Sequence, residues 1–434
     1  MNHLTKPIPL LFIFATLLHL GCANSIRQRP PIEAQKQIAD LQAALKNNPN
    51  EARLWRDLGA AYFEAREYQA ARQSLYQALK RDSRDPKTLF YLGLALEFEQ
   101  RPKLALTVYQ SYQQAPRLSS YRKLMKARYY HLTRRQLQAD MRVLLQRERP
   151  FSADSIAANA VAVFPLLYQG KNEELAALSK GLAEMMITDL SQVQQLEVID
   201  RVRVQALLDE MALGQSGLIE AATAAKAGNL IRAGKILRGT YQLLDKNKLS
   251  VEVAFWDVKK KAFPVATNHS DALKNLFQLE KDIVFGVIDD MGIELTAAER
   301  EKIQRVPTQN LRAFIYYCAG LAKEDAGEFE QAAKSYLKAA ELDQEFKWAV
   351  DKAELAEDLS AVSGEPEEVL SEALALEEPA NQDEMTAEES SLTEDRLENL
   401  EENIDSNFEP GQDSRDATDS GFNLPLRRPP PPPR

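Results

Sequence analysis

The sequence predicts an α+β protein of several domains, with all-α helical repeats first, then a central α/β sandwich with a mixed sheet, one C-terminal helical repeat and a disordered acidic tail. Three observations lead to this fold class. A pattern of large and small residues recurs after 34 positions, extended and helical segments alternate in the middle of the chain, and acids are concentrated near its end. A chain of 434 residues is long enough for about two to three domains.

The first segment, residues 1–21, has the character of a signal peptide. Its apolar run, Ile8–Leu18, is shorter than the about 20 residues that a membrane-spanning helix needs. A small residue, Gly21, then precedes Cys22, which resembles the lipobox of bacterial lipoproteins, with His19 where that pattern usually has leucine. The resemblance implies cleavage before Cys22 and lipidation of this residue. An ordinary cleaved signal and an uncleaved anchor are the alternatives.

The residues after the cysteine bear on location. Residues 22–31 form a short polar tether. Ala23 stands where lipoprotein sorting typically uses Asp to retain a protein in the inner membrane. The resemblance therefore implies a protein that is lipid-anchored in the outer membrane and faces the periplasm. Several acyl chains would make this anchor stable, because each buried CH₂ adds about 0.8 kcal/mol.

Helical periodicity marks residues 32–149 as a repeat region. Two sets of residues stand 34 positions apart and match the tetratricopeptide repeat pattern. The first set is Trp55, Leu58, Gly59, Tyr62, Ala71, Leu75 and Ala78, and the second is Leu89, Leu92, Gly93, Leu96, Ala105, Tyr109 and Tyr112. The small residues let paired helices approach closely, and the large residues fill the space between them.

These sets define two repeats, Ala52–Asp85 and Pro86–Ser119, and predict helices on both sides of them. Ile32–Lys46 has the place of the second helix of a preceding repeat, and residues 120–149 would cap the array as further helices. Helix pairs of this kind cannot bury their apolar faces alone, so the array needs about three units or a capping neighbour.

A third match to the repeat pattern lies far downstream, at Ala313–Phe346. Gly320, Ala332 and Tyr336 have the same offsets as the corresponding residues of the first repeat. We therefore interpret residues 307–348 as a separate element of one repeat.

Residues 155–293 show a different pattern, in which extended and helical segments alternate before three extended runs and a closing amphipathic helix. The segments are extended Ala158–Leu167, helical Glu173–Leu190, extended Leu196–Ile199, helical Val202–Met211 and Ile219–Ala227, extended Leu230–Leu243, Leu249–Val258 and Ala262–Thr267, and helical Asp271–Met291. This order implies an α/β sandwich whose mixed sheet ends in an antiparallel meander.

Several stretches of this region resemble the periplasmic domain of the CsgG/LpoB-like lipoproteins, which is also seen in FlgO-type proteins. They are Val161–Pro165, Gly181–Ser191, Leu196–Arg201, Ile236–Tyr241 and, beyond the sheet, Pro307–Phe314. The resemblance covers roughly residues 159–345. The apolar residues in these stretches are first of all core residues, so they argue for a fold, and a fold alone does not fix a function.

Residues 352–434 form the predicted acidic tail. Residues 351–420 hold 24 Asp and Glu against three basic residues, a composition that cannot bury enough surface to repay ordering. Short helices near Ala353–Leu359 and Glu367–Leu376 are compatible with this sequence, and the proline-rich end favours polyproline II.

A basic stretch complements this tail. Residues 101–150 hold 12 basic residues against two acids, Asp140 and Glu148. Opposite charge in one chain indicates a contact between the two segments or competition for partners. Because the chain is exported, we expect an anionic envelope surface or the chain's own tail as the partner of this stretch, and no nucleic acid.

No motif of the common hydrolases, metalloproteases or phosphate-binding loops is found in the sequence. The four histidines are scattered, which argues against a zinc site. We therefore expect no enzymatic activity, no cofactor and no metal.

The expected sites are sites of binding. By the repeat register, Arg53, Arg56, Phe63, Lys87 and Phe90 line the concave groove of the array. The cations would hold a carboxylate, and the two rings would hold apolar side chains. The alternative is that these residues are ordinary solvated faces of a spacer array.

The sequence thus predicts a non-enzymatic envelope lipoprotein that acts as a protein-binding scaffold or assembly factor in the periplasm. Its partners would be envelope proteins, bound through the repeats and the α/β domain, and the membrane, bound through the lipid anchor. Homo-oligomerisation is left open. The resemblance offers two alternatives, a subunit of a curli-type secretion pore and an activator of a peptidoglycan synthase.

Overall fold

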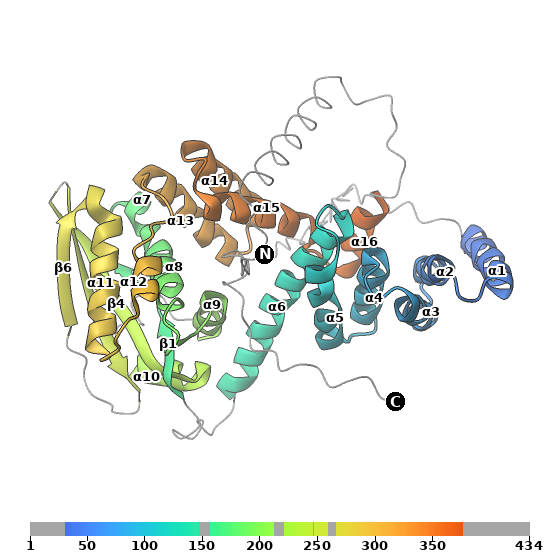
Figure 1. The fold of residues 1–434 in the computed structure, drawn as a ribbon, viewed down its shortest axis with the longest axis horizontal. Helices are drawn as coiled ribbons and strands as arrows, with labels where there is room; N and C mark the ends of the chain where they lie inside the picture. Colours follow the sequence, from blue (N-terminus) through green and yellow to red (C-terminus); the bar gives the residue numbers. More distant parts are fainter. Residues whose placement is uncertain (1–30, 147–156, 212–220, 246, 259–265, 376–434) are drawn as a thin grey trace, which may run out of the picture.

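The computed structural model describes residues 31–146, 157–211, 221–245, 247–258 and 266–375 (Figure 1). The predicted signal peptide, Cys22 with most of the tether, and the chain beyond residue 375 lie outside the described residues. In these ranges, no helix is both long enough and apolar enough to cross a membrane.

The N-terminal helices pack one after another, each against the next along the chain. They are α1 (Pro31–Asn47), α2 (Ala52–Glu64), α3 (Tyr68–Arg81), α4 (Pro86–Phe98), α5 (Pro102–Tyr109), the 3₁₀ helix η1 (Gln110–Gln114) and α6 (Ser120–Gln146). The hairpins α2–α3 and α4–α5 form at the two predicted repeats, and α1 takes the place of the preceding second helix. The predicted capping region is one long helix, α6.

The reversals inside the helical hairpins share one backbone feature. Arg66 and Gln100 stand 34 residues apart, and both have positive φ, of 62° and 58°. Gly327 has the same offset in the downstream repeat and a φ of 79°. Each of these residues follows a helix end, where the left-handed conformation turns the chain back. The repeat therefore preserves the geometry of the turn. Only Gly327, which has no Cβ atom, adopts this conformation without steric strain.

Close approach of the paired helices explains the recurring glycine. A Cβ atom on Gly59 would lie 2.5 Å from Cγ of Leu75, and one on Gly93 would lie 2.2 Å from Cε1 of Tyr109. Any side chain at these positions would push the two helices of a hairpin apart, so the small residue of the pattern is a requirement of packing.

A six-stranded mixed sheet lies at the centre of the described chain. Its strands are β1 (Ala157–Val163), β2 (Leu167–Tyr168), β3 (Glu197–Val198), β4 (Ala233–Asp245), β5 (Lys248–Asp257) and β6 (Ala266–Ala272). The main order is β3-β1-β4-β5-β6, with β2 added to the end of β4. β1 runs parallel to β3 and β4, whereas β4, β5 and β6 form the predicted antiparallel meander.

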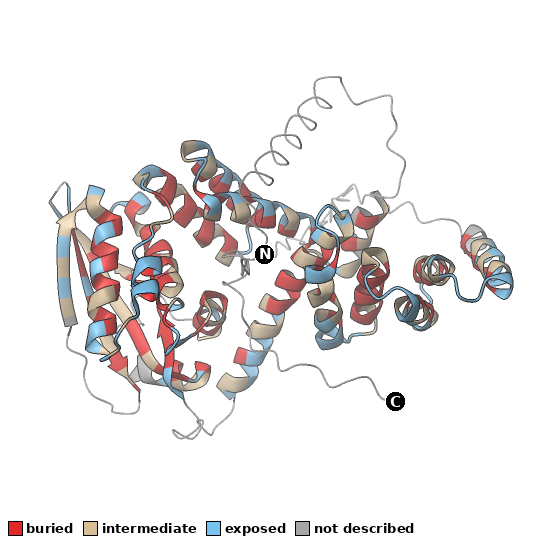
Figure 2. Ribbon diagram, viewed as in Figure 1, coloured by how far each residue is buried: buried red, intermediate tan, exposed pale blue. Residues whose placement is uncertain are grey.

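Helices cover both faces of this sheet. They are α7 (Glu173–Ala176), α8 (Leu178–Leu190), α9 (Arg201–Glu210), α10 (Ala221–Ile231), α11 (Leu276–Asp290) and α12 (Ala297–Ile303). Val161 and Val163 of β1 join the core with α8 and α11, whereas Ala160 and Ala162 join the core with α9 and α10, which Met141 of α6 also enters. Figure 2 shows the buried residues between sheet and helices. The predicted α/β sandwich is confirmed.

The C-terminal helices are α13 (Leu311–Asp325), α14 (Phe329–Leu342), α15 (Lys347–Val362) and α16 (Pro366–Ala375). α13 and α14 form the predicted hairpin, but the expectation of a separate one-repeat element is wrong. α13 packs on α8, and Phe314, Tyr317 and Cys318 belong to the same core as the sheet. Gly181 of α8 makes this contact close, because a Cβ atom there would collide with Sγ of Cys318.

The acidic tail begins later than the predicted boundary at residue 352, which is a second correction. Residues 352–362 continue α15, and α16 follows. Leu355, Leu359 and Val362 of α15 and Val369 of α16 are buried in the core that α4, α5 and α6 form. These apolar residues recur at helical spacing between acids, in the two segments whose sequence is compatible with short helices. The C-terminal helices therefore return to the N-terminal array (Figure 1).

Candidate functional site

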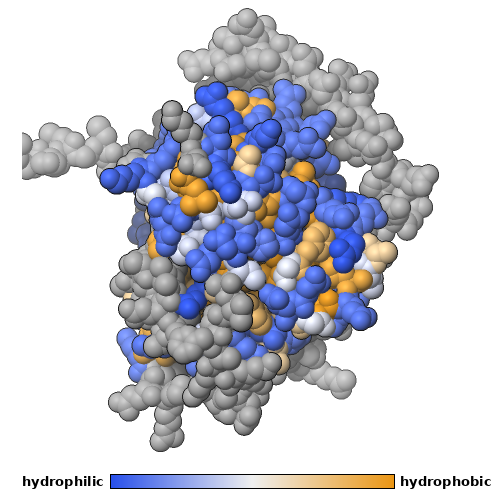
Figure 3. Space-filling view, turned by 90° about the vertical axis from the view of Figure 1, so that its left-hand side faces the viewer, coloured by the Kyte–Doolittle hydropathy of each residue, from blue (hydrophilic) through white to orange (hydrophobic). Residues whose placement is uncertain are grey.

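The face of the molecule on the side of β6 and α11 is largely hydrophilic, and its apolar side chains form small patches among charged ones (Figure 3). Apolar side chains scattered in this way are normal on a soluble surface. This face therefore offers no strong candidate for a binding site.

The cations predicted for the repeat groove are the accessible members of that set. Arg53 of α2 is exposed. Arg56 is half-buried, and its Nη1 lies 3.7 Å from a carboxylate oxygen of Asp85. Lys87, at the start of α4, places Nζ 5.8 Å from the ring centre of Tyr91. Arg56 and Lys87 therefore lie near the loop that joins α3 to α4.

The two aromatic residues predicted for the groove are not accessible. Phe63 is 1% exposed and meets the edge of Tyr91, and Phe90 is 0% exposed and packs against Tyr121. The helix α4 is buried from Thr88 to Glu97 because α6 and α16 cover the side that an open groove would expose. The prediction that these rings hold apolar side chains of a partner is therefore wrong.

A buried arginine fixes this cover in place. Arg128 of α6 is 0% exposed and binds Glu97 of α4 with two hydrogen bonds, of 2.8 and 2.6 Å. Its Nη1 also donates to the carbonyl oxygens of Val362 and Gly364, at 2.7 and 2.8 Å. One guanidinium group thus joins the second repeat to the connection between α15 and α16.

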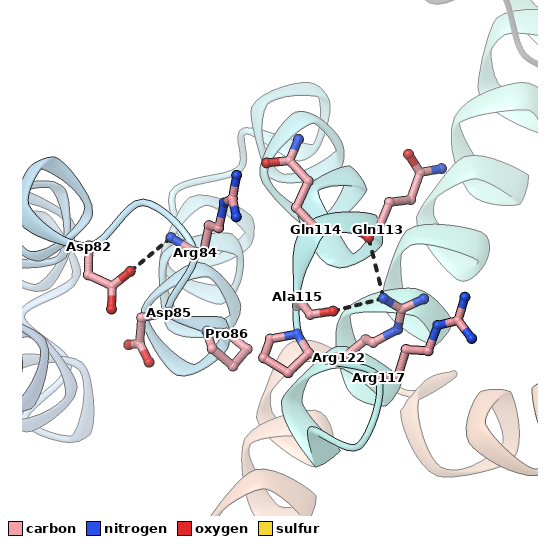
Figure 4. A pocket seen from close by; sticks show the side chains of 10 residues that line it. Asp82, Arg84, Asp85, Pro86, Gln113, Gln114, Ala115, Arg117 and Arg122 are labelled. Carbon is pink, nitrogen blue, oxygen red and sulfur yellow. Dashed lines mark hydrogen bonds between the residues drawn. The ribbon is translucent and has the colours of Figure 1, made fainter. Parts of the chain in front are cut away.

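A polar cleft of about 690 Å³ opens beside the covered groove (Figure 4). Residues 82–86, in the loop from α3 to α4, form one wall. Residues 113–117, at the end of η1, form the opposite wall together with Arg122 of α6. The cleft therefore lies between the ends of two consecutive repeats.

The acids of the cleft are engaged in local structure. An oxygen of Asp82 accepts a hydrogen bond from the backbone N–H of Arg84 at 3.1 Å. Asp85 is the N-cap of α4 and accepts from the backbone N–H of Thr88 at 3.0 Å. Both carboxylates thus stabilise the turn before α4. Because each accepts a hydrogen bond from a backbone N–H group, its repulsion of an incoming anion is partly offset.

Arg122 also has a structural role. Its Nη1 donates to the carbonyl oxygens of Tyr112 and Ala115, at 3.0 and 2.9 Å, which Figure 4 shows in part. The carbonyl of Tyr112 also accepts from the backbone N–H of Ala115, so Arg122 adds to the bonds that end η1. Arg122 thus holds one wall of the cleft in shape.

The mouth of the cleft carries the groups that could contact a ligand. Arg84 and Arg117 are exposed and stand on opposite walls, and the amide side chains of Gln113 and Gln114 are exposed beside them. Leu118, next along the chain, is 86% exposed. Arginine forms bidentate hydrogen bonds with carboxylates, so this arrangement suits an acidic peptide that also has apolar side chains.

Sequence reasoning did not identify Arg84 or Arg117, although the repeat register contains a signal for them. The loop at residues 82–85 and the loop at 116–119 stand 34 positions apart, so the register places them at adjacent corners of the array. The register predicts binding on the helix faces, which α6 and α16 cover, whereas the loops stay accessible.

A second cluster of charge, the carboxylate junction of Glu324 and Asp325, fixes the sheet domain against the repeats. Asp325 binds Arg201 of α9 at 2.6 Å and Lys180 of α8 at 2.5 Å. Glu324 binds Arg201 and Lys352 of α15, both at 3.1 Å. These two neighbouring acids at the end of α13 therefore join four helices.

The last helix of the N-terminal array also reaches the carboxylate junction. Arg134 of α6 donates to the backbone carbonyl of Asp325 at 3.1 Å. Tyr336 of α14 donates to Glu324 at 2.7 Å. The array, the sheet domain and the C-terminal helices therefore meet at one buried site, which positions the cleft relative to the sheet.

Other buried titratable groups have structural surroundings. Burial, with the charges of Arg128 and neighbouring arginines, lowers the pKa of His131 to about 3. Burial raises the pKa of the Cys318 thiol well above its usual value. Among the described residues, no group of three or more His, Cys, Asp and Glu side chains could hold a metal ion.

The comparison with protein families bears on the sheet domain. Residues 154–251 match the family described as curli production assembly/transport component CsgG. The match runs from just before β1 into β5, so it covers the stretches of the sequence resemblance from Val161–Pro165 to Ile236–Tyr241, and ends before Pro307–Phe314. None of the curated proteins compared with the chain matches it.

Solved structures similar to the chain fall into two kinds. The C-terminal domain of LpoB from Salmonella enterica is 12% identical, with a TM-score of 0.22, and the match covers 31% of this chain and 95% of that domain. Yeast Tom70 is 14% identical, with a TM-score of 0.23 and coverage of 79% and 65%. A tetratricopeptide repeat protein from Parabacteroides merdae is 14% identical, with a TM-score of 0.19 and coverage of 75% and 98%.

The carboxylate junction predicts a specific sensitivity to acid. Burial alone would raise the pKa of Glu324, but Lys352, Arg201 and Arg134 outweigh it and lower this pKa to about 2. A carboxyl group whose pKa is depressed in the folded state contributes stability above its unfolded pKa, near 4.3, and loses it as pH falls towards 2. We expect Glu324→Gln to lower the urea midpoint at pH 7 and to flatten its fall between pH 5 and 3.

Glu301→Gln is the control for this measurement. Glu301 pairs with Arg305 on the surface, where 72% and 73% of the two side chains are exposed, and such pairs contribute about 0–1 kcal/mol. Its urea midpoint should follow that of the original chain at each pH, by circular dichroism. An unchanged acid slope in Glu324→Gln would contradict the role assigned to the carboxylate junction.

Proposed function

We propose that the protein is a non-enzymatic lipoprotein of the bacterial envelope that serves as a scaffold or assembly factor and binds acidic segments of partner proteins in the cleft at Arg84 and Arg117. The observation that carries the proposal is the match of residues 154–251 to a family of envelope assembly and transport components. The binding of this domain to helical repeats through the carboxylate junction supports a role in holding partners together.

The cleft supplies the chemistry for recognition. Two exposed guanidinium groups stand on opposite walls, with two exposed amide side chains on the wall of Arg117, and each guanidinium can form paired hydrogen bonds with a carboxylate of a peptide. Lys87, which the repeat register singled out, adds a positive charge next to Pro86 in the wall of the cleft. Such a field favours association with anionic partners and weakens in salt.

The lipid anchor is the second part of the proposal. It rests on the resemblance of Gly21-Cys22 and the apolar run before it to a lipobox, and on Ala23 for delivery to the outer membrane, where the protein would face the periplasm. Intact mass of the mature protein should show acylation at a new N-terminal Cys22, and Cys22→Ser should move the protein to the soluble fraction. A free thiol at this position in membrane-bound protein would contradict the anchor.

A charge-reversed cleft tests the binding role. Residues 23–375, used as bait in an envelope extract at low salt, should recover a defined set of proteins, and R84E/R117E should lose them by at least tenfold because both guanidinium contacts become repulsive. K274E/K302E, which makes the same charge change on exposed lysines near the sheet, is the control and should recover the same set. Equal recovery by R84E/R117E would sink the proposal.

A further inference from the structure

The acidic C-terminal segment is already docked on the basic helix α6 over its first part. Glu354 of α15 lies 3.5 Å from Nζ of Lys123, and Glu365, at the start of α16, lies 3.8 Å from Arg135. These pairs are exposed, and each contributes little energy by itself. Together they hold this part of the segment along α6, in the direction from Lys123 to Arg135.

The rest of the acidic segment is long enough to reach the cleft. Residues 376–420 follow α16, which packs on α4, and the first residue of α4, Pro86, lines the cleft. These 45 residues hold 16 Asp and Glu against two Arg. Extended at about 3.3 Å a residue, they would span about 150 Å, so their length imposes no barrier to reaching the cleft.

We propose that residues 376–420 bind in cis to the cleft between residues 82–86 and 113–122, where their carboxylates pair with Arg84 and Arg117. Two observations favour this occupant: its charge, which is opposite to that of Arg84, Arg117 and Arg122 in the cleft, and the length of chain that follows α16.

The segment also carries apolar side chains. Leu397, Leu400, Ile404 and Phe408 stand between acids at spacings of three and four residues. Leu118, which follows Arg117 in the chain and is 86% exposed, offers them a contact that a purely acidic sequence could not use. The combination of charge and apolar side chains distinguishes this segment from a simple polyanion.

Binding in cis would regulate the cleft in which the proposed function places partner segments. This regulatory consequence rests on the proposed function. A tethered segment has an effective concentration on the order of 1 mM, so a weak contact suffices to keep the cleft filled. A partner must then bind the cleft tightly enough to displace the tethered segment. Salt should release the segment, because it screens exposed ion pairs.

The test compares the chain from residue 23 to 434 with a chain that ends at Ala375. The shorter chain retains every described residue, so its fold is not at issue. The probe is a fluorescent synthetic peptide of residues 376–420, titrated by anisotropy at low salt. We expect it to bind the shorter chain at least tenfold more tightly than the longer chain, in which the cleft is already occupied.

Three variants locate the contact. In the shorter chain, R84E/R117E should weaken binding of the peptide at least tenfold, whereas K274E/K302E should leave it unchanged. A peptide with its Asp and Glu replaced by Asn and Gln should bind neither chain. Equal binding to the short and long chains would overturn occupation in cis, and full binding to R84E/R117E would overturn the cleft as the site.

The outcome is separable from that of the proposed function, because this titration uses only the protein and its own peptide. R84E/R117E could lose the envelope partners while the peptide of residues 376–420 does not bind the shorter chain. The cleft would then bind a partner's segment and not the chain's own, and only this inference would be overturned.

Discussion

The arrangement of the whole molecule depends on two adjacent carboxylates at the end of α13. Glu324 and Asp325 are buried among cations from α6, α8, α9 and α15, so elements that are far apart in the sequence meet at one point. Taking these charges out of water is costly, and their mutual attraction repays that cost only in good geometry. Such a site adds little net stability, but the loss of one partner costs about 3–5 kcal/mol, so it selects one relative orientation of the helices.

Arg128 extends the same logic to the N-terminal array. Its bonds to Glu97 and to the carbonyl groups of Val362 and Gly364 place the end of α15 over the second repeat. This contact closes the helix face that the repeat register marks as a groove, and it leaves the loops between repeats as the accessible part of the array. The position of the cleft is therefore a consequence of how the C-terminal helices return.

Local patterns in the sequence were sufficient for the elements and insufficient for their assembly. Periodicity identified the helical hairpins, the strands and their order, because the glycine at positions 59 and 93 and the alternation in β1 are local requirements of packing. Arg128 and Glu324 were not found, because charged residues in helices usually lie at the surface. Their partners lie up to 236 residues away, as Gly364 does from Arg128, and no local pattern specifies such a pairing.

The same limit explains the errors at the C-terminal end and in the groove. Acidic composition set the predicted start of the tail at residue 352, although the sequence there is compatible with helices. An exposed groove with Phe63 and Phe90 was inferred where α6 and α16 cover α4. The family resemblance, in contrast, depended on apolar core segments whose order is written in the sequence, and the match of residues 154–251 bears it out.

Hydrogen–deuterium exchange by mass spectrometry on the chain ending at Ala375 tests most directly whether the buried charges hold these parts as one unit. The account predicts that α6, α8, α13 and α15 are protected to a similar degree and lose their protection together in Arg201→Met, while the conservative change Arg312→Lys on the surface of α13 has no effect. Rapid exchange of α15 and α16 in the unaltered chain, with the sheet domain still protected, would contradict it.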